Sequence, residues 1–216
     1  LELERYASVG SYPSSPSGSF RVWPLQLLFH SIGWYLVYEE DNVGREEGLI
    51  RSERIDRLAL RTSERGYRRS DEAHDVALKR LGVLLHHSGG IYFGDSLEEQ
   101  LLLCSPRPRI RERALVTLRF CCQNWSFAFI REGLDRYPSE HTRFSMPLVG
   151  DTWWFHPRAP HVLDPGAADD THPYPVEIDL PIWTVARDVH LRNWLFGYGA
   201  GIRIEQPAEL ALEHRQ

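Results

Sequence analysis

The feature that most constrains the fold is a pair of short segments whose side chains alternate between two faces. The first begins at Gly33 and continues Trp-Tyr-Leu-Val-Tyr-Glu, and the second begins at Ile50 and carries guanidinium groups at Arg51 and Arg54. Strict alternation is typical of β-strands, so both segments predict strands. Aromatic rings beside arginines suit phosphates and stacked bases, although a half-buried hairpin with solvated arginines gives the same pattern.

Residues 1–62 contain further strand patterns with no helical pattern between them. The Pro/Ser/Gly-rich stretch Val9–Ser19 predicts a loop, and Ser31-Ile32-Gly33 predicts a tight turn. Short strands at this spacing favour a small closed β-barrel. The predicted strands are Leu1–Ser8, Phe20–His30, Trp34–Asp41 and Leu49–Thr62.

The middle of the chain predicts helices and a linker. Ser70 is a good N-cap for a helix that Gly89-Gly90 ends, and Ser96–Leu103 predicts a second, shorter helix. Arginine and proline dominate Ser105–Arg113, which therefore predicts a linker. The first helix has an apolar stripe made of Ala73, Ala77, Leu81, Leu84 and Leu85.

The remaining sequence predicts the order βαββαβ, which is the split-βαβ pattern of ferredoxin-like domains. Asp188 and Arg192 have the spacing of an ion pair on the second helix. The predicted strands and helices are Ala114–Phe120, Trp125–Tyr137, Arg143–Leu148, Val176–Ile182, Val185–Phe196 and Gly201–Gln206, and a short terminal helix opens at Pro207. The predicted fold class is α+β, with a barrel at 1–66, a helical connector and Arg/Pro linker at 67–113, and a ferredoxin-like domain at 114–216.

Composition narrows the class of protein. A net charge of −5 argues against broad, nonspecific binding of duplex DNA by this part of the protein. Apolar runs are far shorter than a membrane helix needs, and the first residues lack the pattern of a signal peptide, so we expect a soluble cytoplasmic protein without a membrane partner. Cys104, Cys121 and Cys122 lack a metal or redox spacing and predict reduced thiols.

No pattern in the sequence predicts catalysis, and we expect neither an enzyme nor a cofactor. The stretch from His141 to His172 is rich in His, Asp and Pro, but its spacings match no metal motif, so no metal site is predicted either. A metal-dependent nuclease in which Asp169 and Asp170 take part is the alternative. Trp153, Trp154 and Trp183, if exposed, predict self-association, most simply as a homodimer.

Four short motifs follow one another in the first part of the chain, at Leu3-Glu4-Arg5-Tyr6, Arg21-Val22-Trp23-Pro24, Trp34-Tyr35-Leu36 and Ile50-Arg51-Ser52-Glu53-Arg54-Ile55. In this order they resemble the WYL domain of bacterial transcription regulators, although Ile50 stands where that family has Phe, and Glu53 where it has Asp. Three further motifs lie near the other end, at Trp194, Tyr198-Gly199 and Pro207-Ala208-Glu209-Leu210. They resemble the C-terminal extension of WYL domains.

The resemblance implies an Sm-like, SH3-type barrel and a role in transcription regulation. It also implies a preceding helix-turn-helix or winged-helix domain that would bind duplex DNA, and none is visible here. Because the chain begins at Leu1 and its only Met is Met146, we expect a fragment, or a mature region numbered from an internal start. Some members accompany CRISPR loci or other antiviral defence systems. An accessory nucleic-acid-binding protein that modulates such an effector is therefore the second hypothesis.

The predicted ligand is a short single-stranded nucleic acid or a nucleotide. Arg51 and Arg54 have opposite parity, so both reach one pocket only if their strand bulges, twists or ends between them. If one of the two faces away, we expect it to pair with Glu53 or Asp56. The predicted ligand-binding residues are Arg21, Trp34, Tyr35, Arg51 and Arg54.

Overall fold

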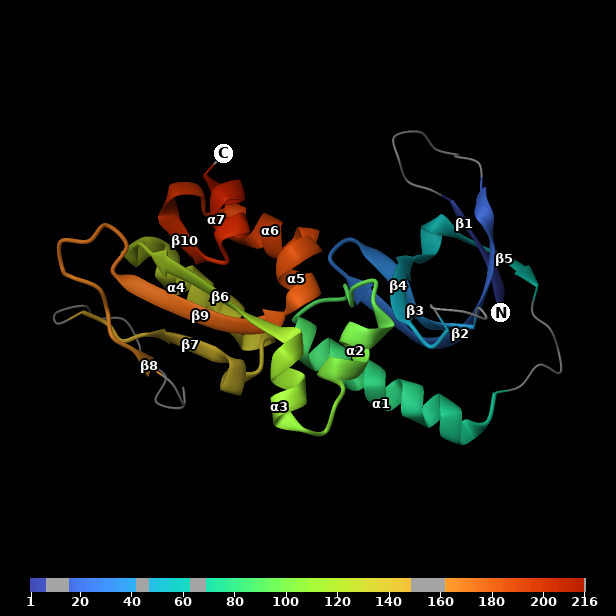
Figure 1. Ribbon diagram of the computed structural model, residues 1–216. Helices are drawn as coiled ribbons and strands as arrows, with labels where there is room; N and C mark the ends of the chain where they lie inside the picture. Colours follow the sequence, from blue (N-terminus) through green and yellow to red (C-terminus); the bar gives the residue numbers. More distant parts are fainter. Residues whose placement is uncertain (7–15, 42–46, 63–68, 149–161, 216) are drawn as a thin grey trace. The chain divides into compact units, whose positions relative to one another are not determined.

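The computed structural model describes residues 1–6, 16–41, 47–62, 69–148 and 162–215, and these form an α+β fold with two five-stranded sheets (Figure 1). Contacts divide the chain into two compact units. The N-terminal unit comprises Leu1–Leu85 and Ile91–Pro106, and the C-terminal unit comprises His86–Gly90 and Arg107–Gln216. Among the described residues, no helix combines the length and the apolar character needed to span a membrane.

The sheet of the N-terminal unit has the order β4-β3-β2-β1-β5, and each neighbouring pair is antiparallel. A tight turn joins β2 to β3 as predicted, and Ser31 takes the left-handed backbone conformation there, with φ 55°. The strands are β1 (Glu2–Tyr6), β2 (Pro16–His30), β3 (Gly33–Glu40), β4 (Ile50–Arg54) and β5 (Leu58–Thr62).

The single strand predicted over Leu49–Thr62 is wrong, because a 3-10 turn at Ile55–Arg57 divides it into β4 and β5. The side chain of Asp56 accepts two hydrogen bonds from Arg54, and these bonds link the last residue of β4 to the turn. β4 and β5 consequently lie at opposite edges of the sheet. The predicted loop also ends earlier than expected, since β2 already begins at Pro16.

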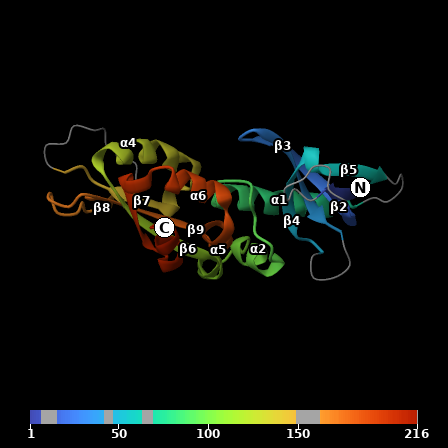
Figure 2. The same ribbon diagram turned by 90° about the horizontal axis from the view of Figure 1, so that it is seen from above.

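Two helices complete the N-terminal unit, and the predicted caps are confirmed. The Ser70 hydroxyl accepts from the backbone N–H of Ala73 at 3.2 Å, before α1 (Asp71–Ser88), and Gly89 follows with φ +60°. The Ser96 hydroxyl caps α2 (Leu97–Leu103), which lies beside β4 in both views (Figure 1, Figure 2). One face of the sheet holds a small core of Leu3, Val22 and Tyr38, and the apolar stripe of α1 is buried at Ala77, Leu81 and Leu84.

The predicted linker over Ser105–Arg113 is partly helical. α3 (Pro108–Arg111) occupies its centre, and a 3-10 turn, Glu112–Ala114, leads into the next strand. Pro108 stands at the start of α3, where its missing N–H costs no helical hydrogen bond. Local backbone preference therefore outweighs the linker-like composition at this point.

The sheet of the C-terminal unit has the order β10-β6-β9-β7-β8, with β7 and β8 parallel and the other pairs antiparallel. Helices separate β6 from β7 and β9 from β10, and the sheet's inner face contributes most of a large apolar core. The strands are β6 (Leu115–Cys122), β7 (Thr142–Ser145), β8 (Val162–Leu163), β9 (Tyr174–Pro181) and β10 (Ile202–Gln206). The helices are α4 (Asn124–Gly133), α5 (Ile182–Arg187), α6 (Val189–Phe196) and α7 (Ala208–His214), and 3-10 turns cover Leu134–Arg136, Ser139–His141 and Gly199–Gly201.

Three predictions in this unit are corrected. The helix predicted over Val185–Phe196 is broken at Asp188, whose carboxylate caps α6 by accepting from the N–H of His190 at 2.8 Å. Arg192 pairs instead with Glu213, at 2.9 Å, so the predicted Asp188–Arg192 ion pair does not form. Trp183 is 3% exposed and belongs to the core, because α5 turns it inward. Trp153 and Trp154 lie outside the described residues.

Candidate functional site

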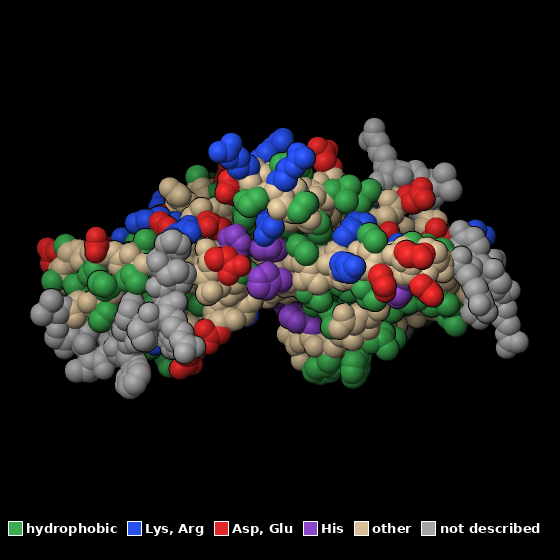
Figure 3. Space-filling model, turned by 90° about the horizontal axis from the view of Figure 1, so that it is seen from below, with side chains coloured by type: hydrophobic (Ala, Val, Ile, Leu, Met, Phe, Trp, Pro, Cys, Tyr) green, Lys and Arg blue, Asp and Glu red, His purple; other side chains and the backbone are tan. Residues whose placement is uncertain are grey.

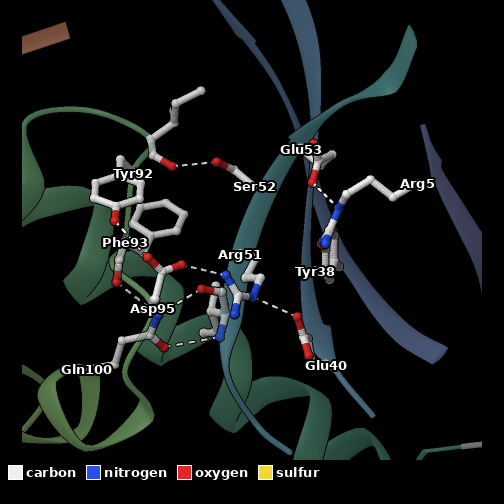
Figure 4. Close-up of polar contacts among 12 residues, drawn as sticks. Arg5, Tyr38, Glu40, Arg51, Ser52, Glu53, Tyr92, Phe93, Asp95 and Gln100 are labelled. Carbon is white, nitrogen blue, oxygen red and sulfur yellow. Dashed lines mark hydrogen bonds and ion pairs between the residues drawn. The ribbon is translucent and has the colours of Figure 1, made fainter. Parts of the chain in front are cut away.

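Arg51 holds together two carboxylates from different parts of the N-terminal unit (Figure 4). It lies on the edge strand β4, directly opposite Tyr38 of β3. Its Nε lies 2.6 Å from the carboxylate of Glu40, and its Nη1 donates to Asp95 at 2.6 Å. The Glu40 side chain is only 4% exposed whereas that of Asp95 is 45% exposed. The arginine therefore joins a buried acid to one that solvent reaches.

Arg5 forms a second charged group beside the same tyrosine. Its Nε donates to Glu53 at 2.7 Å and its Nη2 donates to the Tyr38 hydroxyl at 2.8 Å, while the guanidinium lies 4.8 Å from the centre of the Phe20 ring. Burial raises the pKa of Tyr38 to about 12, so its hydroxyl stays protonated at neutral pH. Arg5 was part of the motif match but was not predicted as a site residue. Its sequence position gave no sign that β1 would bring it next to β3.

Trp34 lies on the same face of β3 as Tyr38, because alternate residues of a strand share a face. It is 56% exposed, and Phe29 packs against it edge to face with ring centroids 5.5 Å apart. Trp34 lies four positions before Tyr38 along the strand, a span of about 13 Å. An exposed aromatic pair and two guanidinium groups thus follow one another along a single face.

Arg54 and Tyr35 lie on the opposite face of the sheet. They are direct partners across β3 and β4, and the register between these strands is regular, so Arg51 and Arg54 cannot point to one pocket. Arg54 donates to both carboxylate oxygens of Asp56, at 3.0 and 2.6 Å. The expectation that an arginine facing away would pair with Asp56 is therefore confirmed.

Arg21 is exposed on β2, opposite Glu2 of β1. Its neighbour Val22 is buried in the core beside Tyr38, so Arg21 faces away from that core. The structure consequently brings together only two of the five predicted residues, Trp34 and Arg51, on the face of Tyr38. Arg21, Tyr35 and Arg54 lie on the other face.

Charge pairing continues on the outer face of the C-terminal sheet. Arg119 and Arg143 both bind Glu177, and Arg143 also donates to Asp179 at 2.6 and 2.8 Å. These hydrogen bonds raise the pKa of Arg143, which stays charged at any physiological pH. Figure 3 likewise shows basic and acidic side chains interspersed over the face that it presents. Because Arg119 and Arg143 both bind carboxylates, their charges are neutralised and do not favour nucleic acid at this place.

The His/Asp-rich stretch is only partly within the described residues. Its Asp170 accepts from Arg203 at 3.1 and 3.2 Å, and hydrogen bonds from that guanidinium lower the pKa of Asp170 to about 2. The His172 imidazole bonds to the Ala200 carbonyl at 2.9 Å. In the part of the chain that the structure describes, no three His, Cys, Asp or Glu side chains are grouped so as to hold a metal ion.

A buried histidine lies at the end of α1, within the C-terminal unit. His87 is 3% exposed, and within the described part of the chain its Nδ1 has no hydrogen-bond partner. The rings of His86 and His141 lie 5.0 and 5.1 Å from it. Burial, with a smaller contribution from the charge of His141, lowers the pKa of His87 to about 4. The group is therefore neutral at physiological pH.

No protein-family model and no curated protein matches this chain. Two solved structures are similar to it. Proteasome accessory factor B/C (PafBC) of Arthrobacter aurescens is 14% identical with a TM-score of 0.35, over 98% of this chain and 23% of that one. A CRISPR Cas-related protein is 13% identical with a TM-score of 0.43, over 99% of this chain and 44% of that one. The chain thus spans less than half the length of either protein.

Proposed function

We propose that this chain is the ligand-sensing and dimerising region of a WYL-type transcription regulator, and that it binds a short single-stranded nucleic acid or a nucleotide. The observation that carries the proposal is the placement of Arg5 and Arg51 on either side of Tyr38, along the face that ends at the exposed Trp34. The motif resemblance over residues 3–55 supports the same reading. Strand orders support an Sm-like barrel and a ferredoxin-like domain as the finer fold.

Each part of this face has a chemical counterpart in such a ligand. The Trp34 ring offers an exposed surface on which a base stacks, and such stacking contributes about 1–3 kcal/mol per base. Guanidinium groups bind phosphate through paired hydrogen bonds. Because the Arg51 guanidinium already binds two carboxylates, a phosphate binds to it only by displacing one of them.

A pair of matched variants tests this assignment. Arg51→Ala should weaken binding by about 1–3 kcal/mol, as expected for lost charge-assisted hydrogen bonds. Arg54→Ala removes the same charge from the opposite face and should leave affinity within about 0.5 kcal/mol of the wild type. Trp34→Ala should cost about 1–3 kcal/mol if the ring stacks on a base.

The measurement is fluorescence anisotropy with a labelled oligothymidine of about ten nucleotides, a length within the range that single-stranded sites cover. Circular dichroism of each variant shows whether it remains folded. Equal losses in the Arg51 and Arg54 variants would contradict the choice of face. An oligonucleotide that does not bind the wild-type protein at all would overturn the proposed ligand class.

A further inference from the structure

We infer that residues 91–100 form a latch on the edge strand β4, and that a phosphate bound at Arg51 loosens this latch. The inference rests on the proposed function, because it concerns how the same site is regulated. It assigns a role to Asp95, Tyr92 and Gln100, which no sequence pattern singled out. All the contacts involved lie within the N-terminal unit.

The latch holds β4 mainly through the side chain of Gln100, which is completely buried. Its Nε2 donates to the carbonyl of Ile50 at 2.7 Å, and its Oε1 accepts from the N–H of Ile50 at 3.1 Å. A single amide thereby supplies the donor and the acceptor that a neighbouring strand would offer to this edge. The Ser52 hydroxyl adds a bond to the Ile91 carbonyl at 2.5 Å, and Gln100 also donates to Phe93 at 3.0 Å, within the latch.

Asp95 is the charged contact between the latch and β4. One of its oxygens accepts from Arg51 at 2.6 Å, and the other accepts from the Tyr92 hydroxyl at 3.0 Å. The carboxylate is therefore held in place by its own segment while it bonds to the strand (Figure 4). It immediately precedes Ser96, whose hydroxyl caps α2. Movement of Asp95 would consequently disturb the start of that helix.

Competition for Arg51 should fall on Asp95 and not on Glu40. A phosphate arrives from solvent, and the Asp95 side chain is 45% exposed whereas that of Glu40 is 4% exposed. Displacing the exposed acid returns it to water, whereas displacing Glu40 would separate a buried carboxylate from a guanidinium that binds it. Ligand binding at Arg51 therefore exchanges the Asp95 bond for a phosphate bond and removes this charged contact between the latch and β4.

The test compares Asp95→Asn with Glu98→Gln, which removes the same charge from an exposed position on the same segment. Affinity for the labelled oligothymidine is measured by fluorescence anisotropy, and hydrogen–deuterium exchange is followed for peptides that cover Ile50 and residues 91–104. Asp95→Asn should bind roughly threefold to tenfold more tightly than the wild type, since an exposed ion pair no longer competes. Glu98→Gln should bind like the wild type. Oligothymidine should speed exchange in both peptides of the wild-type protein.

Gln100→Leu provides a second variant, because it keeps the approximate size of the side chain and removes its hydrogen bonds to β4. Exchange of the Ile50 peptide should then be fast without any ligand. If oligothymidine binds but the Asp95 and Glu98 variants have equal affinity and exchange stays unchanged, the latch is overturned and the proposed function stands. If oligothymidine binds neither the wild type nor Asp95→Asn, the proposed function fails and the latch fails with it.

Discussion

Lowering the pH from about 7 to about 4.5 should destabilise the C-terminal unit, and His87 should account for most of the effect. Its pKa is about 4 in the folded protein and has an ordinary value of 6.5 when the chain is unfolded. Between these values the unfolded state binds more protons, so the free energy of unfolding decreases as the pH falls through 6.5 towards 4. Integrated from pH 7 to pH 4.5, the difference is about 2 kcal/mol.

The structural cause is that a charge at this position is poorly compensated. His87 is buried, its Nδ1 has no hydrogen-bond partner among the residues that the structure describes, and the charges of His141, His86 and Arg111 all oppose protonation. Glu140 is the neighbour that favours protonation, and its contribution is the smallest of those acting on this imidazole. Burial also lowers the pKa of His141, so protonation of His141 at low pH likewise decreases the free energy of unfolding.

His87→Leu removes the titrating group and fills a similar volume. Urea unfolding at about pH 7 and about pH 4.5, read by pulsed hydrogen exchange in β6 and α4, isolates the stability of the C-terminal unit. Between the two pH values, the free energy of unfolding should decrease by about 2 kcal/mol less in the variant than in the wild type. His74→Leu, on the same helix, should retain the wild-type pH dependence. A His87→Leu protein that is as acid-sensitive as the wild type would refute the reasoning.

Two further predictions concern assembly and chemistry. Light scattering at micromolar concentration should give a homodimer. Because Trp183 is buried, Trp183→Ala should lower the free energy of unfolding by about 3–5 kcal/mol and leave the dimer intact. A Trp183→Ala protein that keeps its stability but dissociates into monomers would contradict this placement of Trp183. Single-stranded DNA and RNA should remain intact when incubated with the protein and Mg²⁺ or Mn²⁺. Cleavage that Asp170→Ala abolishes would show a nuclease.

Local patterns in the sequence predicted the elements that depend on neighbouring residues. The Ser70 cap was predictable because a hydroxyl bonds to a backbone N–H three residues away, and the Ser96 hydroxyl caps α2 with the same spacing. The opposite placement of Arg51 and Arg54 was likewise anticipated from strand parity, and the Arg54–Asp56 pair spans two residues. Each of these features depends on the backbone conformation of a few consecutive residues.

Contacts between distant segments were not predictable in the same way. Arg5 meets Glu53 across 48 residues, and Gln100 meets Ile50 across 50 residues. The break at Asp188 and the burial of Trp183 also depend on how α5 packs against its sheet, which helical periodicity does not reveal. Composition alone was also misleading in the Arg/Pro-rich stretch, because it predicted a linker where Pro108 begins a short helix.

The charges around Tyr38 determine what kind of binding this site can support. Arg5 and Arg51 bring two positive charges, while Glu40, Glu53 and Asp95 bring three negative charges, so the group carries a net charge of −1. A phosphate is therefore not drawn to a surplus of arginine. It must exchange with a carboxylate, and of the three acids Asp95 is the most exposed and belongs to a segment outside the sheet. In the proposed scheme, binding affinity and loosening of the latch measure the same exchange, because the Arg51–Asp95 bond competes with the phosphate and also helps to fasten residues 91–100 to β4.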